Sequence, residues 1–214
     1  MPFRIQHTQP VADGLYILDF LYVASYVFDA GDSLVAFDAG INQKMTIGQM
    51  KKLNLDVSKI RNVFFTHSDS DHVGGIKAFP NAKAYLPKDE VAMLDRTTPR
   101  FFGKVYSKPL PFNYETLEDG QELTIGTAKI KCIATPGHTS GSMSYLINDS
   151  ILIVGDEMNL KKGKAVLDLR FISIDNEKRE ESIKKIAKLT GVKLLCTGHS
   201  GFTDNFDAAM KGWR

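Results

Sequence analysis

Phe64-Phe65-Thr66-His67-Ser68-Asp69-Ser70-Asp71-His72 places four side chains that can bind a metal ion within six residues, directly after an apolar run. Serine occupies both intervening positions and Gly74-Gly75 follows, so the loop can curl around an ion. Imidazole and carboxylate groups at this density suit a first-row metal ion, and the adjacent carboxylates would repel one another without a cation. The segment therefore predicts a metal-binding loop at a strand end. The alternative is a solvated acidic loop that caps a helix.

Three further segments repeat this form, in which an apolar run is followed by a turn with glycine or by a glycine and then by a possible ligand. They are residues 133–138, 151–156 and 194–199. Loops that follow strands gather functional groups at one edge of an α/β fold. Helix capping does not explain this repetition, so we expect one shared site. Its members are His67, Asp69, Asp71, His72, His138, Asp156 and His199.

The apolar patterns of the chain alternate between the periods of strands and helices. Strands are expected at 14–18, 22–28, 33–38, 62–66, 129–134, 143–148, 150–154 and 193–196, with the first three forming a β-meander. Helices are expected at 44–53, 73–79, 88–95 and 176–189. No Pro/Ser-rich linker or repeat interrupts residues 1–214, so the sequence predicts a single α/β domain, a sandwich of two sheets with helices outside.

Composition narrows the partners and the location. The 214 residues are 43% hydrophobic, and Lys plus Arg number 27 against 25 for Asp plus Glu. This balance favours a small-molecule substrate over nucleic acid or a membrane surface, and nothing in it selects an oligomeric state. The start of the chain lacks a secretory pattern and no run approaches the ~20 apolar residues of a membrane span, which predicts a cytoplasmic protein. Cys132 and Cys196 lie in apolar runs and are expected to be buried thiols.

The metal loop and the segment Thr135-Pro136-Gly137-His138-Thr139 together resemble the metallo-β-lactamase superfamily over nearly the full chain. The resemblance implies a four-layer αββα sandwich with two metal ions at the shared edge of its sheets. It also implies a supporting role for Asp38, for which a turn or cap role is the alternative. By this analogy the first metal is held by His67, Asp69 and His138, the second by Asp71, His72 and His199, with Asp156 bridging.

One position departs from the family motif, because Asp69 stands where the motif has its second histidine. Three ligand carboxylates against two divalent ions leave one positive charge, which predicts a harder and less Lewis-acidic first site. Oxygen donors shift metal preference toward iron or manganese, while zinc also fits the ligand set. Zinc and iron are therefore the leading cofactors, and manganese is a further candidate.

The resemblance implies a dinuclear metal-dependent hydrolase, in which a metal-bridging hydroxide attacks a small ester, thioester, lactone or related substrate. Asp71 is the expected catalytic residue, orienting the nucleophile or accepting its proton. The carboxylate at Asp69 also resembles the flavodiiron branch, so a di-iron protein that binds oxygen or nitric oxide is the alternative, and a non-catalytic metal-binding module is a third. The aromatic and proline-containing stretches 101–106 and 109–114 are expected either to roof the site or to pack in the core.

Overall fold

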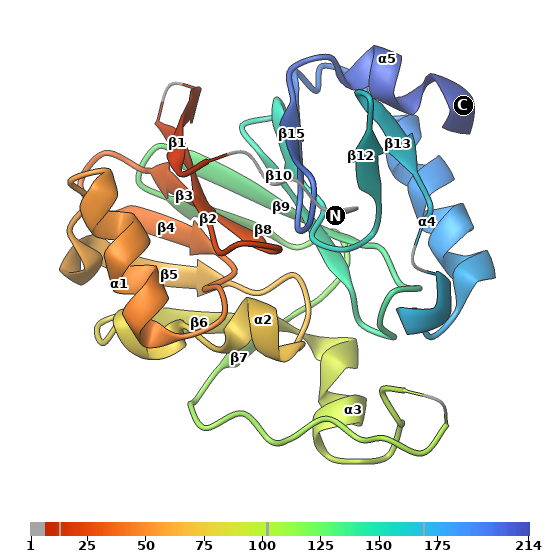
Figure 1. Cartoon of the computed structure of the whole chain (residues 1–214), viewed down its shortest axis with the longest axis horizontal. Coiled ribbons are helices and arrows are strands. Elements are labelled where there is room, and N and C mark those ends of the chain that lie inside the picture. Colours follow the sequence, from red (N-terminus) through yellow and green to blue (C-terminus); the bar gives the residue numbers. More distant parts are fainter. Residues whose placement is uncertain (1–6, 13, 102, 169) are drawn as a thin grey trace.

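A computed structural model describes residues 7–12, 14–101, 103–168 and 170–214 of the chain. Two β-sheets face each other, and helices cover the outer face of each sheet (Figure 1). The four-layer αββα architecture expected from the sequence is confirmed. Among the described residues, no helix has the length and apolar character needed to cross a bilayer.

The first sheet is built from the N-terminal half of the chain in sequence order. Its strands are β1 (Gln9–Ala12), β2 (Leu15–Asp19), β3 (Ala24–Asp29), β4 (Leu34–Phe37), β5 (Ile60–Phe64), β6 (Lys83–Pro87) and β7 (Glu115–Leu117). The pairs from β1 to β4 are antiparallel, which confirms the predicted meander, and those from β4 to β7 are parallel. The carboxyl ends of β4 and β5 therefore meet at one edge of the sheet.

The second sheet has the strand order β15-β14-β11-β10-β9-β8. Its strands are β8 (Glu122–Ile125), β9 (Ala128–Ala134), β10 (Met143–Ile147), β11 (Ile151–Ile153), β14 (Leu194–Thr197) and β15 (Gly201–Thr203). Only β11 and β14 pair in parallel among these described strands, so their carboxyl ends lie side by side. A separate hairpin is formed by β12 (Asn159–Lys161) and β13 (Lys164–Val166).

The helices have clear start signals where they are long. They are α1 (Gln43–Lys52), α2 (Ser70–Val73), α3 (Val91–Leu94), α4 (Asn176–Ala187) and α5 (Phe206–Met210). Short 3-10 turns span Val57–Lys59, Ile76–Ala78, Lys88–Glu90, Arg170–Ile172 and Lys211–Trp213. The Asn42 side chain accepts from Met45 N at 2.9 Å to cap α1, and Asp175 caps α4 through two backbone N–H groups.

The helix expected at 73–79 is wrong in its bounds, because α2 begins earlier, within the metal loop, and ends at Val73. The break falls at Gly74 and Gly75, which pack against the backbone of the segment after β4. A Cβ at Gly75 would lie 2.0 Å from Ala39 O, and one at Gly74 would lie 2.1 Å from Ile41 O. The glycines therefore let the loop that carries Asp71 and His72 rest directly on the end of β4.

Three apolar clusters separate the layers. The cluster between the sheets contains an aromatic stack, with Phe64 centred 4.7 Å from Tyr85 and 5.6 Å from Phe37. Cys132 and Cys196 are buried free thiols in that cluster, as expected. The second cluster lies between the first sheet and the α1 side, and the third lies between the second sheet and α4 and α5. These packed layers hold the strand ends of both sheets in a fixed relation.

Candidate metal centre

Strand ends from both sheets deliver the seven predicted side chains to one place. His67 follows β5, and Asp69, Asp71 and His72 continue the same loop into α2. From the second sheet, β9, β11 and β14 are followed by the remaining three, His138, Asp156 and His199. Ligand atoms from these residues form three clusters, in each of which the atoms lie within 4.8 Å of one another: His67, Asp69 and His138; His67, His72 and Asp156; and Asp71, His72 and His199. The first and last of these are called here the first and the second group, and Asp156 lies against both. The structure thus brings together all seven residues that the sequence singled out.

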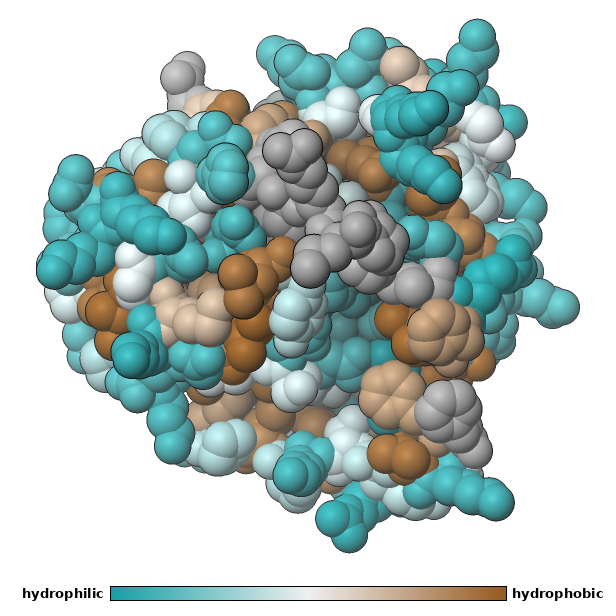
Figure 2. All heavy atoms as spheres, viewed as in Figure 1, coloured by the Kyte–Doolittle hydropathy of each residue, from teal (hydrophilic) through white to brown (hydrophobic). Residues whose placement is uncertain are grey.

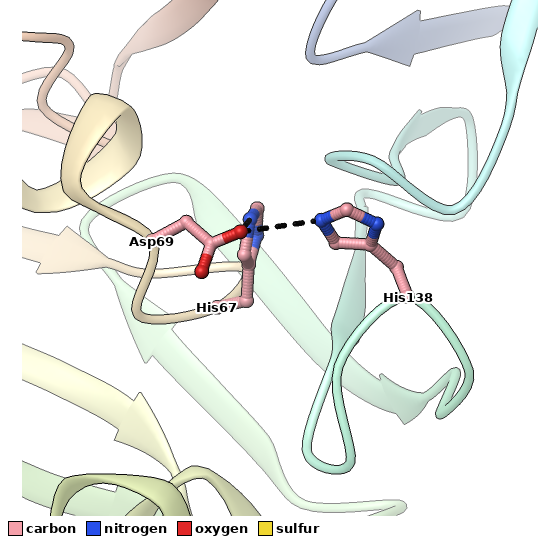
Figure 3. Close-up of side chains that lie close together, drawn as sticks. All are labelled: His67, Asp69 and His138. Atoms are coloured by element: carbon pink, nitrogen blue, oxygen red, sulfur yellow. Dashed lines mark ion pairs between the residues drawn. The ribbon is translucent and has the colours of Figure 1, made fainter. Parts of the chain in front are cut away.

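The first group joins the metal loop to the loop after β9. Figure 3 shows the Asp69 carboxylate pointing toward the rings of both His67 and His138. Asp69 Oδ2 lies 3.4 Å from the Nε2 atom of each ring. Asp156 Oδ2 lies 3.4 Å from His138 Nε2 and 3.9 Å from His67 Nε2. Four candidate ligand atoms therefore surround one position, two of them nitrogen and two of them oxygen.

The second group shares Asp156 with the first. His72 Nε2 lies 3.3 Å from Asp156 Oδ1, and His199 Nε2 lies 2.8 Å from Asp156 Oδ2. Asp71 Oδ2 lies 3.8 Å from His199 Nε2. Because Asp156 faces both groups, its carboxylate is placed where a bridging ligand would be. This position agrees with the role that the family resemblance implies for it.

The separations in the first group fit a metal ion. A tetrahedral ion bound at about 2.0–2.2 Å holds its ligand atoms about 3.3–3.6 Å apart. Three of the four distances in that group, each 3.4 Å, lie in this range. Buried His67 Nε2, His72 Nε2 and Asp156 Oδ1 make no hydrogen bond within the described part of the chain. Buried polar atoms are normally paired, so these three orphaned atoms aimed at one centre fit a metal.

Hydrogen bonds behind the ligands fix the direction of the rings. Buried Asp38 accepts from Thr66 N at 2.8 Å and from Thr66 Oγ1 at 2.9 Å, and it lies 2.7 Å from His72 Nδ1. The Thr66 hydroxyl, having donated to Asp38, accepts from Nδ1 of His67 at 3.0 Å. Nδ1 of His199 donates to Tyr22 O at 2.5 Å. In each ring Nε2 is left as the atom that faces the centre.

The electrostatics of the group follow from burial and close charges. Burial lowers the pKa of His138 to about 4, so its ring is neutral near pH 7. Burial opposes ionisation of Asp69, yet contacts with Arg100, His138 and His67 hold the pKa of this carboxyl well below its usual value. Burial also opposes protonation of His72, but the nearby carboxylates, Asp156 foremost, raise its pKa well above the usual value. The centre therefore attracts positive charge.

Arg100 is a member of this centre that sequence reasoning missed. Its side chain is 2% exposed, and Nε and Nη2 donate to the two oxygens of Asp69 at 2.7 and 2.5 Å. Arg100 lies in the loop after α3, 31 positions from Asp69, and no motif or spacing marks it. The guanidinium revises the charge count of the sequence analysis, because it offsets the carboxylate that replaces the motif histidine.

Two other buried side chains support the loops and were also missed. Arg179 of α4 donates to Glu157 O at 2.7 Å and to Asp156 O at 2.6 Å, which holds the turn that carries Asp156. Glu90 accepts from Ser68 N at 2.7 Å and from the hydroxyl of Thr139, which ties the metal loop to the loop after β9. Charged residues of this kind read as surface groups in a single sequence, so only their burial reveals them.

A cavity of about 550 Å³ adjoins the centre, and Asp69, Asp71 and Arg100 lie in its wall. Residues 101 and 105–111 line it as well, so Phe101, Val105 and Tyr106 of the first stretch and the start of the second stretch roof the site. Phe102 lies outside the described residues. Phe112, in contrast, packs on Phe65 at 5.6 Å, so the end of the stretch belongs to the core. Figure 2 shows a hollow on one face, with hydrophilic residues at its base and hydrophobic residues along its rim.

Two curated proteins are similar to this chain in sequence. A probable metallo-hydrolase of Methanocaldococcus jannaschii is 31% identical over 159 residues, which cover 74% of this chain and 66% of that protein. A hydroxyacylglutathione hydrolase of Pectobacterium carotovorum subsp. carotovorum is 28% identical over 155 residues, which cover 71% of this chain and 52% of that protein. The chain thus matches just under two thirds and about half of the length of these two relatives. Their names support the expectation of a metal-dependent hydrolase.

A solved structure and a family profile agree with this assignment. A metallo-beta-lactamase family protein from Thermus thermophilus superposes with a TM-score of 0.71 and 21% identity, covering 94% of this chain and 78% of that chain. At this identity the likeness speaks for the fold. The sequence profile of the Metallo-beta-lactamase superfamily matches residues 18–199. This range contains all seven side chains of the centre, and the chain belongs to the metallo-β-lactamase superfamily.

Proposed function

We propose that the protein is a metal-dependent hydrolase that acts on a small ester, thioester or lactone. The observation that carries this proposal is the convergence of seven ligand side chains beside a cavity of about 550 Å³. Divalent ions held there would lower the pKa of bound water and polarise a carbonyl oxygen. The relative named for hydroxyacylglutathione, an acyl derivative of a thiol, supports the acyl substrate class.

The chain's own residues divide the remaining work. Asp71 lies both in the second ligand group and in the cavity wall, where its carboxylate can accept a proton from the attacking water. The apolar side chains Val105 and Leu110 line the same cavity and would pack against the acyl part of the substrate. The residues that roof the cavity would shield one side of a bound carbonyl from bulk water. These features favour a small molecule with an apolar portion.

Zinc is the metal we propose first, with iron and manganese as the other candidates. Near-tetrahedral separations among two nitrogen and two oxygen atoms support zinc at the first group. The di-iron alternative depended on Asp69 as an added carboxylate, and Arg100 now balances that charge. The di-iron alternative stays a prediction, and analysis of the bound metal can decide it. Protein purified with and without air should carry zinc, and stoichiometric iron with an oxygen-dependent visible band would favour the alternative.

The hydrolase proposal is tested with a panel of ester, thioester, lactone and β-lactam substrates on metal-loaded protein. We expect turnover of at least one acyl substrate, and we expect Asp71→Asn to lower kcat about 100-fold or more because the proton acceptor is lost. Asp204→Asn is the matched control, since Asp204 is an exposed carboxylate that belongs to none of the ligand groups. Metal content is measured for each variant. Full activity of Asp71→Asn with wild-type metal content would overturn the role of Asp71, and inactivity on the whole panel would overturn the proposed substrate class.

A further inference from the structure

The Arg100 side chain is fixed on every side by the first ligand group and its surroundings. Two of its nitrogens donate to the two oxygens of Asp69, and Nη1 donates to Ile172 O at 2.9 Å. Its guanidinium carbon lies 4.0 Å from the centre of the Phe101 ring. A bidentate pair of this kind is geometrically specific, and its charge is permanent. Arg100 is therefore a built-in cation of the centre.

One contact of Arg100 reaches the atom that a metal would use. Nη2 lies 3.0 Å from His138 Nε2. A guanidinium has donors and no acceptor, so Nε2 of His138 must accept through its ring lone pair. A metal ion at the first group would bind through that same lone pair. The hydrogen bond from Arg100 and the metal bond therefore exclude each other at His138.

Charge acts in the same direction. Arg100 already neutralises Asp69, which is the carboxylate that belongs to the first group alone. A divalent ion near Asp69 would lie beside a fixed positive charge in a buried site, where screening by water is weak. In the second group, Asp71 and His72 have no hydrogen bond to Arg100 among the described contacts. A metal ion in the first group would therefore lie next to the positive charge of Arg100, whereas the described hydrogen bonds do not place that charge beside an ion in the second group.

We propose that Arg100 makes the two metal positions unequal, so that the second group binds its ion tightly and the first group binds weakly until Nη2 leaves His138. This inference rests on the proposed metal centre and is independent of the substrate. The centre then fills in two steps, and at low metal concentration Arg100 serves as the cation of the first group. Metal supply, through the second step, sets the fraction of molecules with a complete centre.

The test is a titration of metal-free protein with Zn²⁺ in competition with a chromophoric chelator, with bound metal counted by mass spectrometry. Wild type is expected to show one tight step and one step at least about tenfold weaker. Arg100→Gln, which removes the charge, should tighten the weaker step at least about tenfold. Arg100→Lys keeps the charge without the planar fork and should fall between the two. Arg170→Gln is the control, because Arg170 is an exposed arginine paired with Glu180.

Two further variants assign the affected step. In a His138→Ala background the first group is incomplete, so Arg100→Gln should leave the remaining affinity unchanged within about twofold. Because Arg100→Gln leaves Asp69 buried without its partner and can impair folding, Asp69→His with Arg100→Gln provides a second route. This pair has no buried charge at either position and should bind two ions tightly, whereas Asp69→His alone, with Arg100 kept, should not fill the first group.

The outcomes separate this inference from the proposed function. Equal affinity of both steps in wild type overturns the role of Arg100 and leaves the hydrolase proposal standing. So does a folded Arg100→Gln in which the weaker step, the filling of the first group, is unchanged or weaker still. Absence of metal binding by wild type overturns the metal centre itself. A weaker wild-type step that persists in the Asp69→His, Arg100→Gln pair also contradicts the inference.

Discussion

Asp38 provides the sharpest test of how the scaffold controls the centre. Its carboxylate accepts three hydrogen bonds, two from Thr66 and one from His72 Nδ1 at 2.7 Å. Its backbone has φ +60, a conformation that asparagine also tolerates. Asp38→Asn therefore keeps the backbone and the side-chain size while removing the negative charge and one acceptor. The sequence left two roles open for Asp38, support of the metal loop and formation of a turn. The structure shows both, because Asp38 bonds to Thr66 and His72 and also has a positive φ.

The expected loss of metal affinity in Asp38→Asn follows from the hydrogen bond between Asp38 and His72 Nδ1 that the substitution removes. An amide nitrogen facing His72 Nδ1 either repels its N–H or forces the ring into the other tautomer, with the proton on Nε2. That proton would occupy the atom that faces the centre, so His72 loses its function as a ligand. A hydrogen bond to a charged group contributes about 1.5–3 kcal/mol. Loss of such a supporting partner weakens metal affinity about 10- to 100-fold.

The assay is the same chelator competition, carried out on Asp38→Asn, wild type and Asp29→Asn. Asp29 also accepts one backbone N–H, that of Gly31 at 2.9 Å, but in an exposed turn of the first sheet. We expect weaker zinc binding for Asp38→Asn only, with the tight step affected, since His72 belongs to the second group. Urea unfolding of the metal-free proteins separates lost ligation from lost stability. Folded Asp38→Asn with wild-type affinity would refute the orienting role.

Three further predictions follow from buried contacts and charge. Arg179→Lys, which loses the bonds to the carbonyl groups around Asp156, should lower the unfolding free energy by about 2–4 kcal/mol in urea titrations, and an unchanged midpoint would contradict this. Gly75→Ala should prevent soluble expression or destabilise the protein strongly, whereas Gly48→Ala, which has open space in α1, should stabilise it by about 0.5–1 kcal/mol. The pKa of Asp119 is lowered by the Ala134 N–H and Lys185 against burial, so its stabilising effect is present above its unfolded pKa and is lost as pH falls. Asp119→Asn should therefore lower the thermal midpoint slightly at pH 6 and not at pH 2.5, and an equal difference at both pH values would contradict the assignment.

Much of the fold could be predicted because its elements have local signatures. The strand before His199 is a short, fully buried run, the strand before His138 alternates buried residues with exposed lysines, and β5 ends in buried Val63 and Phe64. Helix α4 has the 3.6-residue period and an aspartate cap. Seven of the described strands were not predicted, namely β1, β6, β7, β8, β12, β13 and β15. Apart from the mostly buried β6, these are strands of three or four residues with partly exposed side chains, which carry no clear alternation. The helix expected at 73–79 forms instead at Ser70–Val73, where Gly74 and Gly75 pack against neighbouring backbone. Such a close backbone approach leaves no mark in the apolar periodicity, so the sequence did not reveal it.

In the candidate site, too, some residues could be predicted from the sequence and others could not. His67, Asp71 and the Thr135–Thr139 segment could be recognised because ligands in a metal motif have fixed spacings that are readable in one chain. The function of Arg100 could not be recognised, since a lone arginine between a proline and a phenylalanine resembles any solvated side chain. Its significance comes from its contact with Asp69, which loop folding alone creates.

By itself the sequence determined the family, the layered architecture and the set of seven side chains, because apolar periodicity and ligand spacing are properties of neighbouring residues. The tertiary structure decided the charge of the first ligand group, the partner of Asp69 and the shape of the cavity. These depend on groups that lie far apart along the chain and meet only when the two sheets pack, where burial strengthens each charge interaction.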